Sequence, residues 1–194
     1  MALRSRRSFL MLGAGDAVLW ADCSRGKAAL AEVSYPDKPQ RKVAPLPASV
    51  LSRQQFRKKC VGCLKCVQAC PRRVLKASDS IGAFLRPEMD FRQGWCFPEC
   101  SLCAKACPTG ALGKSLAAEA KLNKKVGSAV WDRSKCLSLK GEKCTACERH
   151  CPVGAITHAS DGAVVVNAQK CIGCGACENH CPVRPLTAVY VEGV

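Results

Sequence analysis

The sequence predicts an α+β protein built from two small, loop-rich units in tandem. Four runs of cysteines follow one another along its 194 residues, and each run ends in Cys-Pro. Aromatic residues make up only 5% of the chain, which is too few to fill an ordinary apolar core. The stretches 130–136 and 165–171 are similar to each other, and each is typical of a strand that leads into a loop. Repetition of a short unit therefore organises the predicted fold.

The first cysteine run, residues 60–71, reads C-V-G-C-L-K-C-V-Q-A-C-P. This C-x2-C-x2-C-x3-C-P spacing holds [4Fe–4S] clusters in bacterial ferredoxins. Three thiolates come from one loop, and in proteins with two clusters the fourth thiolate binds the other cluster. Gly62 and Ala69 are small enough to let the backbone approach the cluster closely. The run therefore predicts an iron–sulfur site.

The same run recurs three more times, so we predict four [4Fe–4S] clusters and two bacterial-type ferredoxin-like units. The second run has three residues between its first two cysteines, and the third run has seven. We expect each unit to hold two clusters. The predicted ligands are Cys60, Cys63, Cys66, Cys70, Cys96, Cys100, Cys103, Cys107, Cys136, Cys144, Cys147, Cys151, Cys171, Cys174, Cys177 and Cys181.

The spacing leaves the pairing of the runs open. Runs one and two can exchange their fourth cysteines, with runs three and four doing the same. A nested arrangement, in which run one pairs with run four and run two pairs with run three, satisfies the spacing equally well.

Residues 1–31 are interpreted as a twin-arginine export signal. Arg6-Arg7 precedes an apolar stretch, and Ala29-Leu30-Ala31 is an acceptable cleavage site. The apolar stretch is too short to span a membrane and contains Asp16. Cys23 belongs to no run and is expected to be removed with the signal. These features predict a periplasmic protein that is at most peripheral to the membrane.

The remainder divides into four predicted segments. Residues 32–50 are rich in proline and are interpreted as an extended linker without packed structure. Residues 51–113 hold runs one and two, residues 114–128 form a linker helix by propensity, and residues 129–194 hold runs three and four.

Two shorter elements are predicted at the start of, and within, the unit that holds runs one and two. Residues 50–59 favour a short helix with Leu51 and Phe56 facing inward. Residues 84–86 favour a short strand.

The formal charge of +15 does not indicate nucleic-acid binding. Without residues 1–31 the chain keeps 25 basic and 13 acidic side chains, a net charge of +12. Four clusters with their thiolates would add roughly −2 each, which leaves about +4. Many lysines and arginines are therefore interpreted as compensation for cluster charge, and no stripe of interleaved basic and aromatic residues accompanies them.

Zinc binding and catalysis are both poorly supported by the sequence. A zinc site needs two pairs of cysteines, whereas these runs offer three evenly spaced cysteines followed by Cys-Pro. His150 and His180 precede fourth cysteines, where an exposed position on a helical turn is the simplest interpretation; His158 is the third histidine. No glycine-rich nucleotide fingerprint lies outside the signal and the cysteine loops. We therefore predict an electron-transfer protein, not an enzyme.

Residues 50–190 resemble the NapG, NapF and MauM family of ferredoxin-type proteins, from periplasmic nitrate reductase and methylamine utilisation systems. The third run carries the most specific likeness, with Cys136-Leu137 followed by a long gap to Cys144. The twin-arginine signal is similar to those of NapG and MauM, whereas residues 87–91 and 107–112 are closer to NapF.

The resemblance implies two different roles. NapG-like proteins pass electrons from a quinol-oxidising membrane partner to a periplasmic reductase, and this is the role that we expect. NapF-like proteins are cytoplasmic accessory proteins for maturation of a molybdoenzyme such as nitrate reductase, and this is the alternative. An electron-transfer subunit of another molybdoenzyme complex would differ only in its partner.

Overall fold

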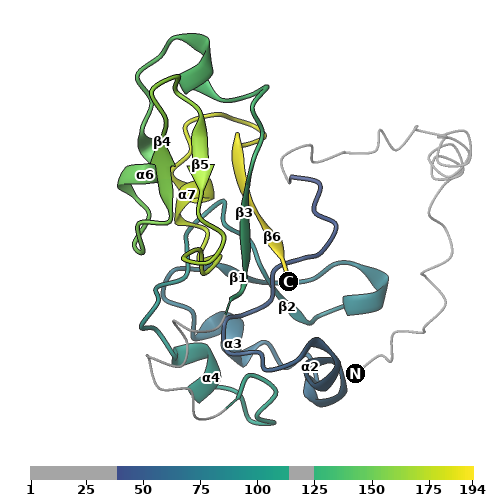
Figure 1. Cartoon of the computed structure of the whole chain (residues 1–194). Coiled ribbons are helices and arrows are strands. Elements are labelled where there is room, and N and C mark those ends of the chain that lie inside the picture. Colours follow the sequence, from purple (N-terminus) through teal and green to yellow (C-terminus); the bar gives the residue numbers. More distant parts are fainter. Residues whose placement is uncertain (1–38, 114–124) are drawn as a thin grey trace, which may run out of the picture. The chain divides into compact units, whose positions relative to one another are not determined.

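The computed structural model describes residues 39–113 and 125–194. The predicted export signal, Cys23 and most of the predicted linker helix lie outside these ranges. Among the helices that the structure describes, none is long and apolar enough to cross a membrane. Short helices and strands joined by loops make up the described chain (Figure 1), which confirms the predicted α+β class.

Each cysteine run places its third cysteine in a helix of a single turn. These helices are α3 (Lys65–Gln68), α4 (Leu102–Lys105), α6 (Ala146–Arg149) and α7 (Ala176–Asn179). One residue separates each helix from the fourth cysteine, and the proline after that cysteine has no N–H with which to extend a helix. The Cys-Pro pair therefore keeps each helix short and leaves the other three cysteines of each run outside it.

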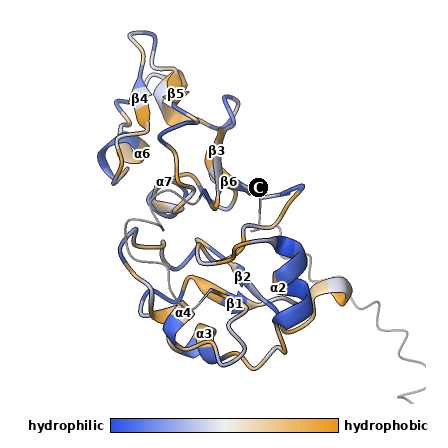
Figure 2. Ribbon diagram, turned by 60° about the horizontal axis from the view of Figure 1, so that its bottom comes forward, coloured by the Kyte–Doolittle hydropathy of each residue, from blue (hydrophilic) through white to orange (hydrophobic). Residues whose placement is uncertain are grey.

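The first unit contains one helix and one hairpin besides its cysteine loops. Helix α2 (Arg53–Lys59) is hydrophilic except at Phe56, which is buried (Figure 2). The predicted inward position of Leu51 is wrong, because this side chain precedes the helix and is 58% exposed. Strand β1 (Leu75–Ala77) pairs antiparallel with β2 (Pro87–Met89).

The predicted strand over residues 84–86 is also wrong. A 3-10 turn, η1 (Ile81–Ala83), comes just before it, and Leu85 has a φ of +60°. Extended backbone needs a negative φ, so the strand begins only at Pro87.

The second unit is closed by its first and last strands. β3 (Gly127–Trp131) pairs antiparallel with the C-terminal strand β6 (Val189–Gly193), and β4 (Ile156–His158) pairs with β5 (Val164–Val166). A 3-10 turn, η2 (Leu137–Lys140), lies in the long gap of the third run. The prediction that the similar stretches before runs three and four contain strands is confirmed by β3 and β5.

The prediction that the proline-rich segment is unpacked is wrong for residues 39–50. Val43 donates its N–H to Glu192 Oε1 at 2.5 Å and accepts the N–H of Gly193 at 2.9 Å. Pro45 and Ser49 are fully buried. The prolines keep the segment extended, and its backbone groups satisfy one edge of β6 instead of water.

Backbone contacts place the described residues, 39–113 and 125–194, in one compact unit. The apolar pairs after the first three runs are buried, as are Val189 and Val191 of β6. Phe91 is fully buried, and a Cβ at Gly175 would lie 1.9 Å from its ring. With a φ of +81° as well, residue 175 must be glycine for run four to pack against Phe91.

Candidate functional site

All sixteen cysteines within residues 39–113 and 125–194 are free thiols. Eight of them are buried and seven are half-buried, so that Cys63 is the only exposed one of the sixteen. Buried cysteines that lie next to one another either pack as small hydrophobic side chains or bind a metal centre. The way in which the thiols are grouped distinguishes these two roles.

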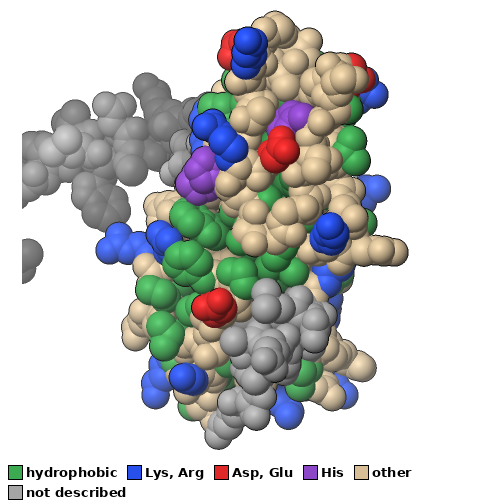
Figure 3. Space-filling model, turned by 60° about the vertical axis from the view of Figure 1, so that its left-hand side comes forward, with side chains coloured by type: hydrophobic (Ala, Val, Ile, Leu, Met, Phe, Trp, Pro, Cys, Tyr) green, Lys and Arg blue, Asp and Glu red, His purple; other side chains and the backbone are tan. Residues whose placement is uncertain are grey.

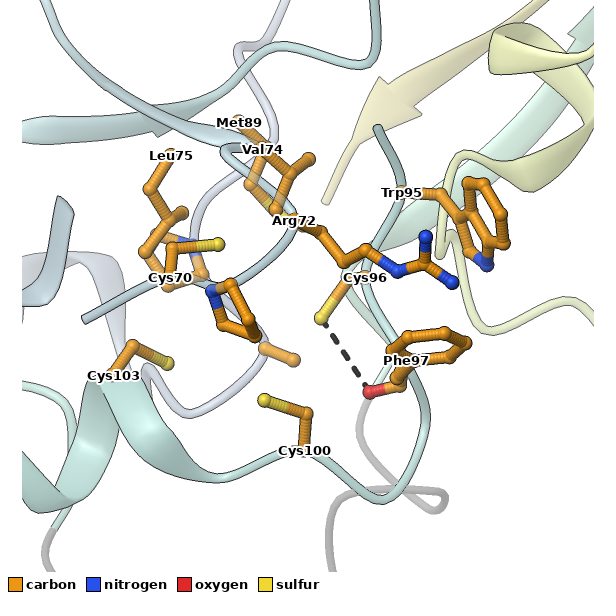
Figure 4. A pocket seen from close by; sticks show the side chains of 13 residues that line it. Cys70, Arg72, Val74, Leu75, Met89, Trp95, Cys96, Phe97, Cys100 and Cys103 are labelled. Atoms are coloured by element: carbon orange, nitrogen blue, oxygen red, sulfur yellow. Dashed lines mark hydrogen bonds between the residues drawn. The ribbon is translucent and has the colours of Figure 1, made fainter. Parts of the chain in front are cut away.

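One group combines the first two runs. Cys70, the fourth cysteine of run one, lines a cavity together with the first three cysteines of run two (Figure 4). Val74, Leu75 and Met89 form an apolar wall of this cavity. The four thiols of this group are Cys70, Cys96, Cys100 and Cys103.

The reciprocal group is found around Cys66. Burial raises the pKa of Cys66, and with smaller contributions from the neighbouring thiols Cys103, Cys60 and Cys107 it reaches about 11. Cys107, the fourth cysteine of run two, is thus close enough to Cys66 of run one to affect its ionisation, as Cys103 is. Together with the place of Cys70 in the cavity of run two, this favours an exchange of fourth cysteines between runs one and two.

Runs three and four are related in the same way. Cys181, the fourth cysteine of run four, lines a cavity with the first three cysteines of run three, Cys136, Cys144 and Cys147. Burial raises the pKa of Cys174, and with contributions from neighbouring thiols, of which Cys151 has the largest effect, it reaches about 11. The structure thus favours the pairing of run one with run two and of run three with run four over the nested arrangement.

Hydrogen bonds from the backbone support the fourth cysteines. Ala155 donates its N–H to Cys151 Sγ at 3.2 Å. Burial opposes ionisation of Cys107, but hydrogen bonds from Leu112, Thr109 and Ala111 outweigh it and lower the pKa of this thiol. Residues four positions after the fourth cysteine thus donate to sulfur while their side chains enter the core.

These thiols fit a [4Fe–4S] cluster by their number and their placement. A cluster is held by four thiolates, each on a different iron, so the sulfur atoms surround it instead of meeting at a point. Within the described part of the chain, no three Cys, His, Asp or Glu side chains converge closely enough to hold a single metal ion.

An unpaired donor supports the same fit beside run three. The indole Nε1 of Trp131 is buried, and it makes no hydrogen bond of normal geometry within the described residues. Burial raises the pKa of the Cys136 thiol, yet Ser138 and then Trp131 favour the thiolate enough to lower it. A buried N–H needs an acceptor, and the Cys136 sulfur can serve as one for Trp131 when it is ionised, which is its state as a cluster ligand.

One of the three histidines, His158, lies at a cysteine cavity. His158 Nε2 is 3.9 Å from Cys147 Sγ, and its Nδ1 is 2.6 Å from Glu148 Oε2. His158 also lines the cavity of the third run. Sequence reasoning gave this residue no role, because β4 brings it to the cavity from outside every cysteine run.

His150 and His180 stack on each other. Their ring centroids are 3.8 Å apart, and the ring of His180 also lies 4.7 Å from that of Trp95. His150 is exposed, as the simplest interpretation of the sequence expects, whereas His180 is half-buried. The two histidines therefore join the ends of the third and fourth runs.

Comparisons with known proteins match both halves of the chain to iron–sulfur proteins. The 4Fe-4S dicluster domain family matches residues 59–111, and a second 4Fe-4S dicluster domain family matches residues 141–185. Two such domains imply four [4Fe–4S] clusters.

Curated relatives extend this likeness beyond the single domains. The ferredoxin-type protein MauM of Methylorubrum extorquens is 35% identical over 152 residues, which cover 77% of this chain and 67% of that protein. The ferredoxin-type protein NapG of Escherichia coli is 35% identical over 112 residues, 55% of this chain and 47% of NapG. MauM of Paracoccus denitrificans is 36% identical over 110 residues. The matched part of the chain spans about two thirds of the first relative and about half of the others.

Proposed function

Because the chain belongs to the family of ferredoxin-type iron–sulfur proteins that includes MauM and NapG, we propose that it is an exported electron carrier whose described cysteines hold four [4Fe–4S] clusters. The exchange of fourth cysteines between neighbouring runs is the observation that carries this proposal. The four ligand sets are Cys60, Cys63, Cys66 with Cys107; Cys96, Cys100, Cys103 with Cys70; Cys136, Cys144, Cys147 with Cys181; and Cys171, Cys174, Cys177 with Cys151.

The bound clusters supply one-electron chemistry, in which each takes up or releases one electron. The residues of the chain set how readily this happens. These residues bury the thiolates, donate hydrogen bonds from N–H groups to sulfur and place cationic side chains nearby. Each of these three effects changes the reduction potential of a cluster. The proposal therefore assigns the chain no substrate chemistry.

A direct contact supports transfer between the two units. The N–H of Cys96 donates to the carbonyl oxygen of Cys174 at 2.9 Å. These residues belong to the ligand sets of different units, so the proposal brings one cluster site of each unit next to the other.

Exposed apolar groups support a protein partner. Hydrophobic side chains reach the surface over the face shown in Figure 3, among scattered basic and acidic side chains. Phe97 and Leu102 are exposed and line an open groove that also includes Cys100. Exposed apolar groups beside a ligand are a suitable docking surface for a redox protein.

The twin-arginine sequence supports a periplasmic location. The resemblance to NapG-like proteins supports a place between a quinol-oxidising membrane partner and a periplasmic reductase. The MauM relatives are named for methylamine utilisation, so a reductase is not the sole candidate partner. The alternative is a NapF-like maturation role, which requires a cytoplasmic protein.

The deciding experiment measures iron and acid-labile sulfide per chain, on protein isolated anaerobically from separated periplasmic and cytoplasmic fractions. About sixteen irons per periplasmic chain, the sum of four clusters, are expected. The same iron content in cytoplasmic protein alone would favour the maturation role. Zinc in place of iron would overturn the proposal.

A further inference from the structure

Arg72 is held between two aromatic rings at the edge of a cysteine cavity. Its guanidinium carbon lies 4.2 Å from the ring centroid of Trp95 and 4.1 Å from that of Phe97. Figure 4 shows the guanidinium extended between these rings, above the thiol of Cys96. Arg72 also lines the cavity that Cys70 shares with the second run.

The backbone is shaped to create this arrangement. A Cβ at Gly94 would lie 2.2 Å from the carbonyl oxygen of Arg72. The loop of run two can therefore approach Arg72 only with glycine at this position, and the next residues then supply the two rings. The rings of Trp95 and Phe97 meet edge to face, with centroids 5.6 Å apart.

Within residues 39–113 and 125–194, no carboxylate neutralises the charge of Arg72. Arg41 pairs with Glu178 and Arg92 pairs with Asp90, but no acidic side chain within the described residues forms an ion pair with Arg72. Two aromatic faces hold the cation without cancelling its charge. The positive charge therefore acts on whatever the adjacent thiols bind.

We propose that Arg72 raises the reduction potential of the cluster held by Cys70, Cys96, Cys100 and Cys103. Reduction adds a negative charge to the cluster, and a nearby cation stabilises the reduced form more than the oxidised form. The protein interior screens this attraction less than water does. This inference rests on the proposed function, because it takes the ligand set from it.

The test is a redox titration of the purified, anaerobic full chain, followed by electron paramagnetic resonance. Arg72→Gln should make reduction of one cluster about tenfold less favourable, which is about 59 mV for a one-electron couple. The other three clusters should keep their potentials. Cys100→Ser identifies the affected signal, because it should change the same cluster.

Two matched variants separate charge from structure. Arg72→Lys keeps the charge and should keep the potential close to that of the wild type. Arg73→Gln removes an exposed arginine from the next position and should change no potential. Iron content reports on folding in every variant.

The outcomes distinguish this inference from the proposed function. Fewer than four clusters in the wild type would contradict the proposed function. Four clusters with unchanged potentials in Arg72→Gln, or an equal fall in Arg73→Gln, would overturn only the role of Arg72. If the Arg72→Gln protein does not bind all four clusters, the Trp95→Leu variant tests the role of Arg72 instead. This substitution removes one of the two rings that hold the guanidinium but keeps its positive charge. A smaller fall in the same potential then supports the role of Arg72, and no fall contradicts it.

Discussion

Cys70 and Cys100 line one cavity although they belong to different cysteine runs. The helical turn of α3 ends just before Cys70, and the chain then turns away from its own run toward run two. Each of the two runs is therefore incomplete without the other, which makes the unit of function a pair of runs. This exchange leads to the first prediction.

Cys70→Ser should disturb the same cluster as Cys100→Ser, not the same cluster as Cys63→Ser. The reason is that Cys70 lies with the thiols of the second run, away from its own. The measurement is a comparison of paramagnetic resonance spectra of the three reduced variants. Matching spectra for Cys70→Ser and Cys63→Ser would show that the fourth cysteine serves its own run.

Cys147→Ser should lose or convert one cluster and leave most of the remaining iron in place. Cys181→Ser should affect the same cluster, because both thiols line one cavity. Iron analysis with visible spectroscopy tests both. Cys23→Ser is the control and should change neither. An unchanged cluster content in Cys147→Ser would exclude run three as a cluster site.

Trp131→Phe should lower the potential of the cluster at run three while all four clusters remain bound. The phenyl ring preserves much of the packing, but the indole N–H that faces Cys136 is lost. One hydrogen bond contributes about 1 kcal/mol, which corresponds to about a fivefold change in the reduction equilibrium. A redox titration measures the change. Trp95→Phe is a control for loss of an indole, since it should leave this potential unaltered.

Asp90→Asn should destabilise the protein at pH 7. Asp90 is buried and binds Arg92 Nη2 at 2.6 Å and Lys76 Nζ at 3.0 Å. Burial opposes its charge, but the hydrogen bonds from Arg92 and Lys76 hold the pKa of Asp90 well below its usual range. Loss of the charge should cost about 2 kcal/mol, the scale of a hydrogen bond to an ionised group.

The sign of the pH dependence follows from that lowered pKa. The carboxylate stabilises the folded protein above its pKa in the unfolded chain, about 4, and this contribution is lost as the pH falls further. The difference in melting temperature between wild type and Asp90→Asn, followed by cluster absorbance, should therefore be full at pH 7 and begin to shrink as the pH falls toward about 4. Asp79→Asn, at an exposed aspartate, is the control. Equal melting temperatures at pH 7 would contradict the role of Asp90.

The sequence was a good guide to elements whose cause is local. The one-turn helices and their ends depend on residues within a few positions of each other, such as Cys70 and Pro71, and the strands before runs three and four follow from their apolar patterns. Leu51 and residues 84–86 were assigned wrongly because their conformation depends on a turn and on packing that short patterns do not encode. Residues 39–50 were assigned wrongly because a strand distant in the sequence, β6, binds them.

By itself the sequence determined the number of thiols, their local spacing and hence the kind of cofactor, because three cysteines within one loop can present thiolates to a cluster without help from the rest of the chain. The tertiary structure decided which fourth cysteine joins each group, and it brought Arg72, Trp131 and His158 to the cysteines. These choices are long-range, since side chains from separate segments meet only when the chain has packed. The chemistry of the sites is therefore local in origin, whereas their pairing and electrostatic surroundings are properties of the fold.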